Sequence, residues 1–405
     1  MPARWTIAAA ALLLSSMAHA QEPPPIGAAP TILRAEPYVF DTAEQHGITV
    51  SVVAKGFARP FALEVLPGGD MLVAVRGGAL LLIRAGTGAP SAAPVEVAGM
   101  PQLTPAHSNT GLHDLALDPD FAANGLVYWT WNIPVPNPAD AAARPELGRI
   151  ALMRGKLAGG RMSDVVTLYE ARVAGYPGGS RVAVDEDGMI WITTGAPFGE
   201  AAQNLATPYG KVLRLNRDGS IPRENPFTSV VGADPAIYSY GHRDQHALAL
   251  FGGLVYTGEH GPNGGDEVNV ILPGGNFGWP INSYGKNYDG TAFPAPAQAE
   301  GVEEPLLVWI PSIAISGMLF YNGDAFPAWR GNMFVGSGVR GGIPGTGGLE
   351  RVVPGENFGG LRRETLLTDL HQRVRDVVQG PDGLIYVLTD GNENAVLRLA
   401  PAELP

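Results

Sequence analysis

Four side chains with acidic or imidazole groups lie close together in one glycine-rich stretch, residues 256–280. Glu259, His260, Asp266 and Glu267 occur there in the sequence YTGEHGPNGGDEVNVILPGGNFGWP. Hard cations such as Ca²⁺ take six to eight oxygen ligands from carboxylates and backbone carbonyls, and this stretch offers both. These residues alone leave open the alternative of a turn between two strands whose acids are solvated.

Two arginines near the C-terminus form a second group with chemical potential. Arg373 and Arg375 alternate in the sequence RVRD. In a strand, side chains two residues apart point to the same face. Two guanidinium groups on one face can clamp carboxylates, since arginine binds them in a planar, bidentate manner. The alternative is a solvated pair on an edge strand.

The composition indicates how such groups are positioned. The 405 residues include 54 glycines and 36 prolines, and only 16% are charged. This favours many short strands and turns over long helices. The net charge of −12 argues against a nucleic-acid partner, which needs basic patches. There is no cysteine, so neither a disulfide nor a CxxCH haem site is possible.

A turn followed by an apolar strand recurs six times along the chain. The six segments are 66–75, 118–131, 185–195, 251–258, 326–338 and 380–391. Gly, Asp and Asn in the turns supply the positive backbone angles of hairpins. Six such units predict an all-β protein, a six-bladed β-propeller over residues 46–405. The repeat count and the chain length argue against a two-sheet sandwich.

The N-terminus predicts export. Arg4 precedes the apolar run Ile7–Leu14, and Ala18-His19-Ala20 has the small-x-small pattern of a cleavage site. We therefore expect a signal peptide over residues 1–20, cleaved near Ala20, and a periplasmic or secreted protein. Residues 21–45 are rich in Pro and Ala and are interpreted as an extended segment. No run after the signal peptide is long enough to span a bilayer as a helix.

Ordered motifs over most of the chain resemble those of the glucose/sorbosone dehydrogenases, the soluble aldose sugar dehydrogenases that depend on pyrroloquinoline quinone (PQQ). Besides EHGPNGGDEVN and GGNFGWP, these are KGFARPFALEVLPGG, GLHDLALDPDF, GSRVAVDEDG, GKVLRLNRDGSIPRENPF, YGHRD and RVRDVVQGPDGLIYVLTD. The resemblance also implies a six-bladed propeller.

The resemblance implies a set of ligands for PQQ and calcium. The carbonyls of Gly261 and Pro262 match those that bind the calcium next to PQQ, and Asp266 and Glu267 match positions at a second calcium. The implied PQQ contacts are Asn109, Arg243, Asp244, Arg340, Arg373 and Arg375. Of these, Asp244 stands where several family members have asparagine. Arg243 also matches a catalytic arginine that stabilises negative charge on the quinone.

The general base of the family is absent from its usual place. The family has a histidine two residues before its GSR motif, and here that position is Pro177. His246 is the first candidate for a substitute catalytic base, and His107 and His113 are further candidates. Two alternatives stay open: a different substrate that supplies its own acidity, and a propeller that has lost turnover. His260 is interpreted as a residue that packs the loop, because calcium prefers oxygen and no second histidine lies at a zinc-like spacing.

The expected activity is oxidation of an aldose at its anomeric carbon to the lactone, with hydride transfer to PQQ and reoxidation by an external electron acceptor. Two alternatives are a non-catalytic calcium-binding propeller that binds glycans or proteins, and a calcium-dependent lactonase. The clustered arginines favour PQQ. The sugar and the oligomeric state are not predicted.

Overall fold

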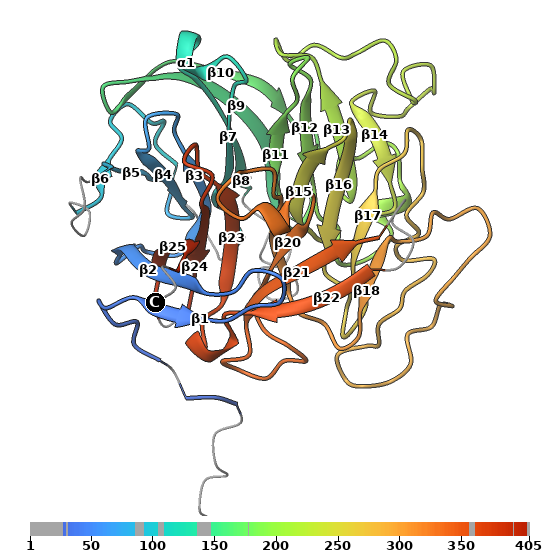
Figure 1. The fold of residues 1–405 in the computed structure, drawn as a ribbon. Coiled ribbons are helices and arrows are strands. Elements are labelled where there is room, and N and C mark those ends of the chain that lie inside the picture. Colours follow the sequence, from blue (N-terminus) through green and yellow to red (C-terminus); the bar gives the residue numbers. More distant parts are fainter. Residues whose placement is uncertain are drawn as a thin grey trace, which may run out of the picture.

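Strands form six antiparallel sheets that are arranged around a common centre (Figure 1). The computed structural model describes residues 27–29, 31–85, 93–103, 109–135, 147–176, 178–355, 361–391 and 393–402. The predicted six-bladed β-propeller is confirmed. The predicted signal peptide, its cleavage site near Ala20, residues 21–26 and Pro177 lie outside the described residues.

Five of the sheets have four strands, each formed by consecutive strands of the chain. The first sheet contains β3 (Pro60–Val65), β4 (Met71–Val75), β5 (Leu80–Ile83) and β6 (Val95–Glu96). The second contains β7 (Gly111–Leu117), β8 (Leu126–Pro134), β9 (Gly148–Ala158) and β10 (Arg161–Glu170). The third contains β11 (Val182–Val184), β12 (Ile190–Thr193), β13 (Lys211–Leu215) and β14 (Ile237–Tyr240). The fourth contains β15 (Gln245–Phe251), β16 (Leu254–Glu259), β17 (Asp266–Val270) and β18 (Leu307–Trp309). The fifth contains β19 (Ile315–Phe320), β20 (Met333–Ser337), β21 (Gly348–Pro354) and β22 (Leu361–Leu366).

The sixth sheet closes the ring by joining the two ends of the chain. It has five strands in the order β1-β2-β25-β24-β23. Its members are β1 (Tyr38–Phe40), β2 (Ile48–Lys55), β23 (Val374–Gln379), β24 (Ile385–Thr389) and β25 (Ala395–Pro401). β2 pairs with β25 from Ile48 opposite Pro401 to Lys55 opposite Ala395. β1 lies within the segment that was expected to be an extended lead-in.

The first strand of each blade lines the centre of the propeller. β3, β7, β11, β15, β19 and β23 contact one another in a closed circle. Each of the six repeats in the sequence corresponds to the turn and the second strand of one blade, where β4, β8, β12, β16, β20 and β24 lie. Gly69 illustrates the turn: its φ of 87° is left-handed, and its amide donates to Leu66.

Apolar clusters between neighbouring blades hold the ring together. Leu72 and Leu82 of the first blade pack with Trp129 of the second, and all three are buried. Burial of a leucine side chain contributes roughly 1.5–3 kcal/mol. A similar cluster joins the fifth and sixth blades, with Phe334 against Leu397. The core is thus distributed around the ring.

Helices are short in the described part of the chain. They are α1 (Phe121–Asn124) and the 3₁₀ turns η1 (Ala201–Gln203), η2 (Pro327–Trp329) and η4 (Thr368–Leu370). Among the described residues, no helix has the length and apolar character needed to cross a membrane.

Candidate functional site

The candidate site lies at one mouth of the central channel. The first strand of each blade starts there and the second strand ends there, because the two strands are antiparallel. A cavity of about 460 Å³ opens at this mouth. Its wall includes Asn109, His246, His260, Arg373 and Arg375, which come from three blades.

The cavity is lined with positive charge. Its wall contains Arg59, Arg76, Arg373, Arg375 and the carboxylate of Asp390. Arg375 donates to Asp390 through Nε at 2.7 Å and Nη2 at 2.6 Å, and Arg373 donates to it through Nε at 3.2 Å. The two arginines thus reach the same carboxylate, although Arg373 precedes β23 and the strand register shifts between Val374 and Asp376.

Repulsion among the arginines shows that the positive charge is concentrated. Burial, followed by the charges of Arg375 and Arg59, lowers the pKa of Arg76 to about 9. The ring of Phe61 lies beneath: the guanidinium carbons of Arg76 and Arg375 are 4.5 and 5.7 Å from its centroid. An anionic ligand would relieve this repulsion, so the cavity fits a flat polycarboxylate.

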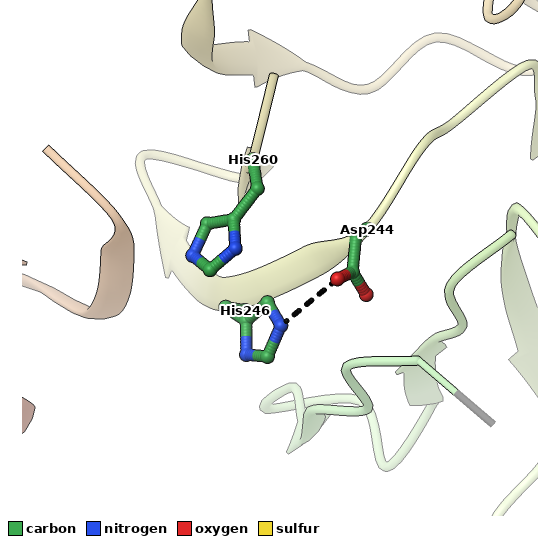
Figure 2. A group of neighbouring side chains, drawn as sticks. All are labelled: Asp244, His246 and His260. Atoms are coloured by element: carbon green, nitrogen blue, oxygen red, sulfur yellow. Dashed lines mark ion pairs between the residues drawn. The ribbon is translucent and has the colours of Figure 1, made fainter. Parts of the chain in front are cut away.

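Asp244, His246 and His260 form a second group of neighbouring side chains at this mouth (Figure 2). Nε2 of His246 is 3.4 Å from Oδ2 of Asp244. The imidazole rings of His246 and His260 stack with centroids 4.3 Å apart. Burial, then the charge of His260, lowers the pKa of His246 to about 3. His246 is therefore neutral at pH 7.

Glycines allow the backbone to approach this cluster. The amide of Gly179 donates to Oδ1 of Asp244 at 2.7 Å. A Cβ on Gly178 would be 2.5 Å from Oδ1 of Asp244, and a Cβ on Gly179 would be 2.0 Å from the Gln245 carbonyl oxygen. Neither spacing accommodates a side chain, so the sequence GGSR fixes this contact.

Arg243 holds the glycine-rich loop that follows β16. Its Nη1 donates to the carbonyls of His260 at 2.8 Å and Gly261 at 2.9 Å. Its Nη2 donates to the hydroxyl of Tyr288 at 3.1 Å. The Gly261 carbonyl, implied as a calcium ligand together with the Pro262 carbonyl, thus already accepts from a cationic group. A carbonyl oxygen has a second lone pair, with which that of Gly261 could also bind a cation.

The two acids of the second predicted calcium site differ in their environment. Asp266 accepts backbone amides from Gly261, Ile313 and Ile315 at 3.0–3.2 Å. Glu267 instead lines a small cavity of about 20 Å³ together with Glu259, roughly the size of one water or ion. Burial, followed by the charge of Glu259, raises the pKa of Glu267 well above its ordinary value. The Glu259–Glu267 pair therefore fits a cation better than Asp266 does.

The other predicted residues are divided between the cavity and its surroundings. Asn109 lines the cavity and donates to the hydroxyl of Tyr176 at 2.8 Å. Arg340 instead pairs with Glu350 and donates to Thr365 at 3.2 Å, on the outer strands of the fifth blade. Its role in cofactor binding stays a prediction. His113 is buried, with Nε2 3.2 Å from the Asn109 carbonyl oxygen, and His107 lies outside the described residues.

Sequence reasoning missed Arg59, Arg76 and Asp390 and gave His260 a different role. His260 does hold the loop, but its ring also faces the cavity. A positional signal was available: Arg76, His260 and Asp390 each directly follow the second strand of a blade. Because these strand ends converge at one mouth, the residue after each repeat is a candidate for the cavity wall.

Fold and site together define a β-propeller with an arginine-lined ligand cavity at one mouth. The family model described as Glucose / Sorbosone dehydrogenase matches residues 57–398. The chain is 35% identical over 364 residues to "Aldose sugar dehydrogenase YliI" of Escherichia coli K12, covering 87% of this chain and 93% of that protein. The chain belongs to the glucose/sorbosone dehydrogenase family.

Solved structures agree with this assignment. The apo-form soluble aldose sugar dehydrogenase from Escherichia coli matches with a TM-score of 0.78 and 32% identity, covering 88% of this chain and all (100%) of that one. The PQQ-bound aldose sugar dehydrogenase from Streptomyces coelicolor matches with a TM-score of 0.64 and 26% identity, covering 87% of this chain and 98% of that one.

Proposed function

We propose that the protein oxidises an aldose at its anomeric carbon to the lactone, using PQQ bound in the central cavity and calcium beside it. The main support is the charge of the cavity. Although the net charge of the chain is −12, four arginines line a single cavity, and the acidic groups there are Asp390 and the nearby Asp244. A glycan-binding surface or a lactonase does not need this charge, whereas a tricarboxylate does.

The residues that would hold PQQ are those of the cavity wall. Arg373 and Arg375 would bind its carboxylates, with Arg76 and Arg59 adding positive charge. Asn109 supplies an amide to the wall of the same cavity. The Gly261 and Pro262 carbonyls would bind the calcium next to it, with Arg243 alongside, and Glu267 would bind a second calcium. When bound, PQQ accepts hydride from the sugar and calcium polarises the quinone.

We propose His246 as the proton acceptor for the sugar hydroxyl. Its imidazole is neutral at pH 7, because burial, then the charge of His260, lowers its pKa to about 3. Asp244, 3.4 Å away, would stabilise the imidazolium that forms. The Arg181 Nε donates to the His246 carbonyl at 2.7 Å and fixes the backbone. A group positioned this way substitutes for the histidine that Pro177 replaces.

The test is turnover. The chain from residue 21, loaded with PQQ and Ca²⁺, is mixed with a panel of aldoses and an artificial electron acceptor. With a two-electron acceptor, we expect lactone and reduced acceptor in equal amounts for at least one sugar. PQQ binding without lactone from any aldose would overturn the proposed activity.

We also propose that the protein is exported and that its reduced cofactor is reoxidised by an external acceptor. The support is the N-terminal sequence, with its apolar run and the Ala18-His19-Ala20 pattern. N-terminal sequencing of the protein from its native host is expected to begin at Gln21.

A further inference from the structure

Asp244, His246 and His260 are brought together by one pair of strands. Gln245 of β15 lies opposite Glu259 of β16, and the His260 amide donates to the Asp244 carbonyl at 3.0 Å. Asp244 and His260 flank this residue pair, and His246 lies at a β-bulge, because the register shifts between Gln245 and Ala247. The three side chains therefore converge at the mouth (Figure 2).

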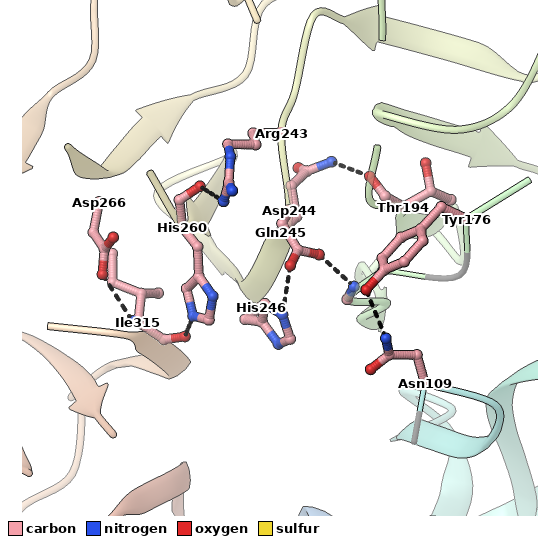
Figure 3. Close-up of polar contacts among 12 residues, drawn as sticks. Asn109, Tyr176, Thr194, Arg243, Asp244, Gln245, His246, His260, Asp266 and Ile315 are labelled. Carbon is pink, nitrogen blue, oxygen red and sulfur yellow. Dashed lines mark hydrogen bonds and ion pairs between the residues drawn. The ribbon is translucent and has the colours of Figure 1, made fainter. Parts of the chain in front are cut away.

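Hydrogen bonds to neighbouring backbone fix two of the three groups and leave one atom of each available. Nε2 of His260 lies 2.6 Å from the Ile315 carbonyl oxygen, which leaves Nδ1 with a lone pair (Figure 3). Histidines that bind metals nearly always donate their other ring N–H in this way. Oδ1 of Asp244 accepts the Gly179 amide, which leaves Oδ2.

The third group, His246, is nearly buried and lacks a partner on one side. It is 8% exposed, and its Nδ1 has no hydrogen-bond partner among the described residues. Its Nε2 points at Oδ2 of Asp244. Nε2 is thus the ring nitrogen that faces Asp244, whereas the buried Nδ1 on the other side of the ring stays unsatisfied.

The distances suit a small metal ion. Nε2 of His246 and Oδ2 of Asp244 are 3.4 Å apart. Two ligand atoms that each lie about 2.1 Å from a tetrahedral ion are about 3.4 Å apart. The available atoms of all three residues lie within 4.8 Å of one another. The rings of His246 and His260 are stacked with their planes 16° apart, so His260 must shift and also rotate before its nitrogen can bind the same ion.

We propose that Asp244, His246 and His260 bind a first-row divalent transition metal ion, with Zn²⁺ as the representative ion. Two imidazoles and one carboxylate favour such ions, whereas calcium prefers oxygen. The remaining coordination positions face the cavity, where water or an anionic ligand can fill them. This site is separate from the calcium ligands expected at the Gly261 and Pro262 carbonyls.

Protonation and nearby charge are compatible with metal binding at neutral pH. His246 is neutral at pH 7. Burial acts to raise the pKa of the Asp244 carboxyl, but its contacts with His246, His260 and the Gly179 amide hold that pKa well below its ordinary value. Both groups are thus already in their ligating forms. Arg375, which lines the same cavity, is paired with Asp390, and this pairing reduces the repulsion between Arg375 and a bound cation.

The metal site also has a consequence for the proposed sugar oxidation, although it does not depend on it. A ligated His246 has no lone pair left for a proton at Nε2. A bound transition metal and a proton-accepting His246 therefore exclude each other, and the metal-loaded protein should not oxidise sugar.

Metal binding is tested on the chain from residue 21 without PQQ, after removal of metals with a chelator. Titration calorimetry with Zn²⁺ is expected to give one ion per chain, and excess Ca²⁺ should not displace it. Co²⁺ should give visible absorption bands of a nitrogen and oxygen site, since the chain has no cysteine. His246→Gln and Asp244→Asn should each weaken binding at least tenfold, because loss of even an outer partner of a ligand costs roughly 10- to 100-fold.

His46→Gln is the matched control, because His46 is an exposed histidine that also pairs with an aspartate, Asp41. It should bind Zn²⁺ like the wild type. Circular dichroism confirms that each variant is folded. Equal affinity of wild type and His246→Gln, or no stoichiometric binding by the wild type, would overturn the metal site. Neither result bears on PQQ binding, which is measured separately.

Discussion

At the residue scale, several contacts hold Arg375 in the wall of the cavity. It donates two hydrogen bonds to Asp390, its guanidinium lies over Phe61, and its carbonyl accepts Nη2 of Arg181 at 3.1 Å. The alternation of Arg373 and Arg375 was visible in the sequence. Asp390, which orients both, was not, because it is 15 residues away from Arg375 along the chain.

We expect Arg375→Ala to weaken PQQ binding by roughly 10- to 100-fold, because a hydrogen bond to a charged group contributes about 1.5–3 kcal/mol. Arg375→Lys should recover only part of this affinity, because lysine lacks the planar fork. An absorption titration with PQQ measures both. Arg398→Ala, at an exposed position of β25, is the control and should bind normally. Unchanged affinity in Arg375→Ala would place the carboxylates elsewhere.

His246→Gln tests the proposed proton acceptor. Glutamine keeps a polar side chain but accepts no proton, so kcat should fall by about two to four orders of magnitude. The affinity for PQQ should change little. Stopped-flow reduction by an aldose separates the two effects. His46→Gln, at an exposed histidine that pairs with Asp41, serves as control. Full turnover in His246→Gln would assign the proton to another group.

At the scale of elements, the six repeats predicted the turns and second strands of all six blades, because those patterns are local. Two features were beyond the sequence. The pairing of β2 with β25 joins segments more than 300 residues apart, and no local pattern encodes it. The histidine partner of His260 was sought at a zinc-like sequence spacing, but β15 and β16 bring His246 to it across the strand pair.

Gly179→Ala should disrupt the approach of the GGSR segment to β15. The added Cβ would be 2.0 Å from the Gln245 carbonyl oxygen, so the backbone must shift. Overpacking of this kind typically costs about 1–3 kcal/mol. Urea unfolding measures the loss. Gly68→Ala is matched, because a Cβ there meets no atom within 4 Å, and it should be neutral. Equal stability of both variants would contradict the tight contact.

At the scale of the whole molecule, the central channel carries buried charge below the cavity. Arg181 pairs with Asp114 and Asp376, both at 3.1 Å. Glu64 of β3 lines the same channel. Burial, followed by the charges of Asp114 and Asp376, raises the pKa of Glu64 to about 8 from its ordinary value of 4.5.

This shift predicts a pH dependence of stability. Between pH 4.5 and 8 the folded protein keeps a proton on Glu64 that the unfolded chain releases. The stabilising contribution is therefore complete below pH 4.5 and is lost as the pH rises through 8. Glu64→Gln should gain stability relative to wild type at pH 8 compared with pH 5, measured by urea unfolding. Glu186→Gln, at an exposed glutamate, should follow the wild type at both values.

The central claim is that the arginine-lined cavity binds PQQ with calcium, and an equilibrium absorption titration of the chain from residue 21 tests it most directly. With Ca²⁺ present, we predict saturable spectral change at one PQQ per chain. Chelation of calcium should weaken binding, because the Gly261 and Pro262 carbonyls would lose the ion they share with the cofactor. Absence of saturable binding with and without calcium would contradict the account and leave a family member whose cavity serves another anion.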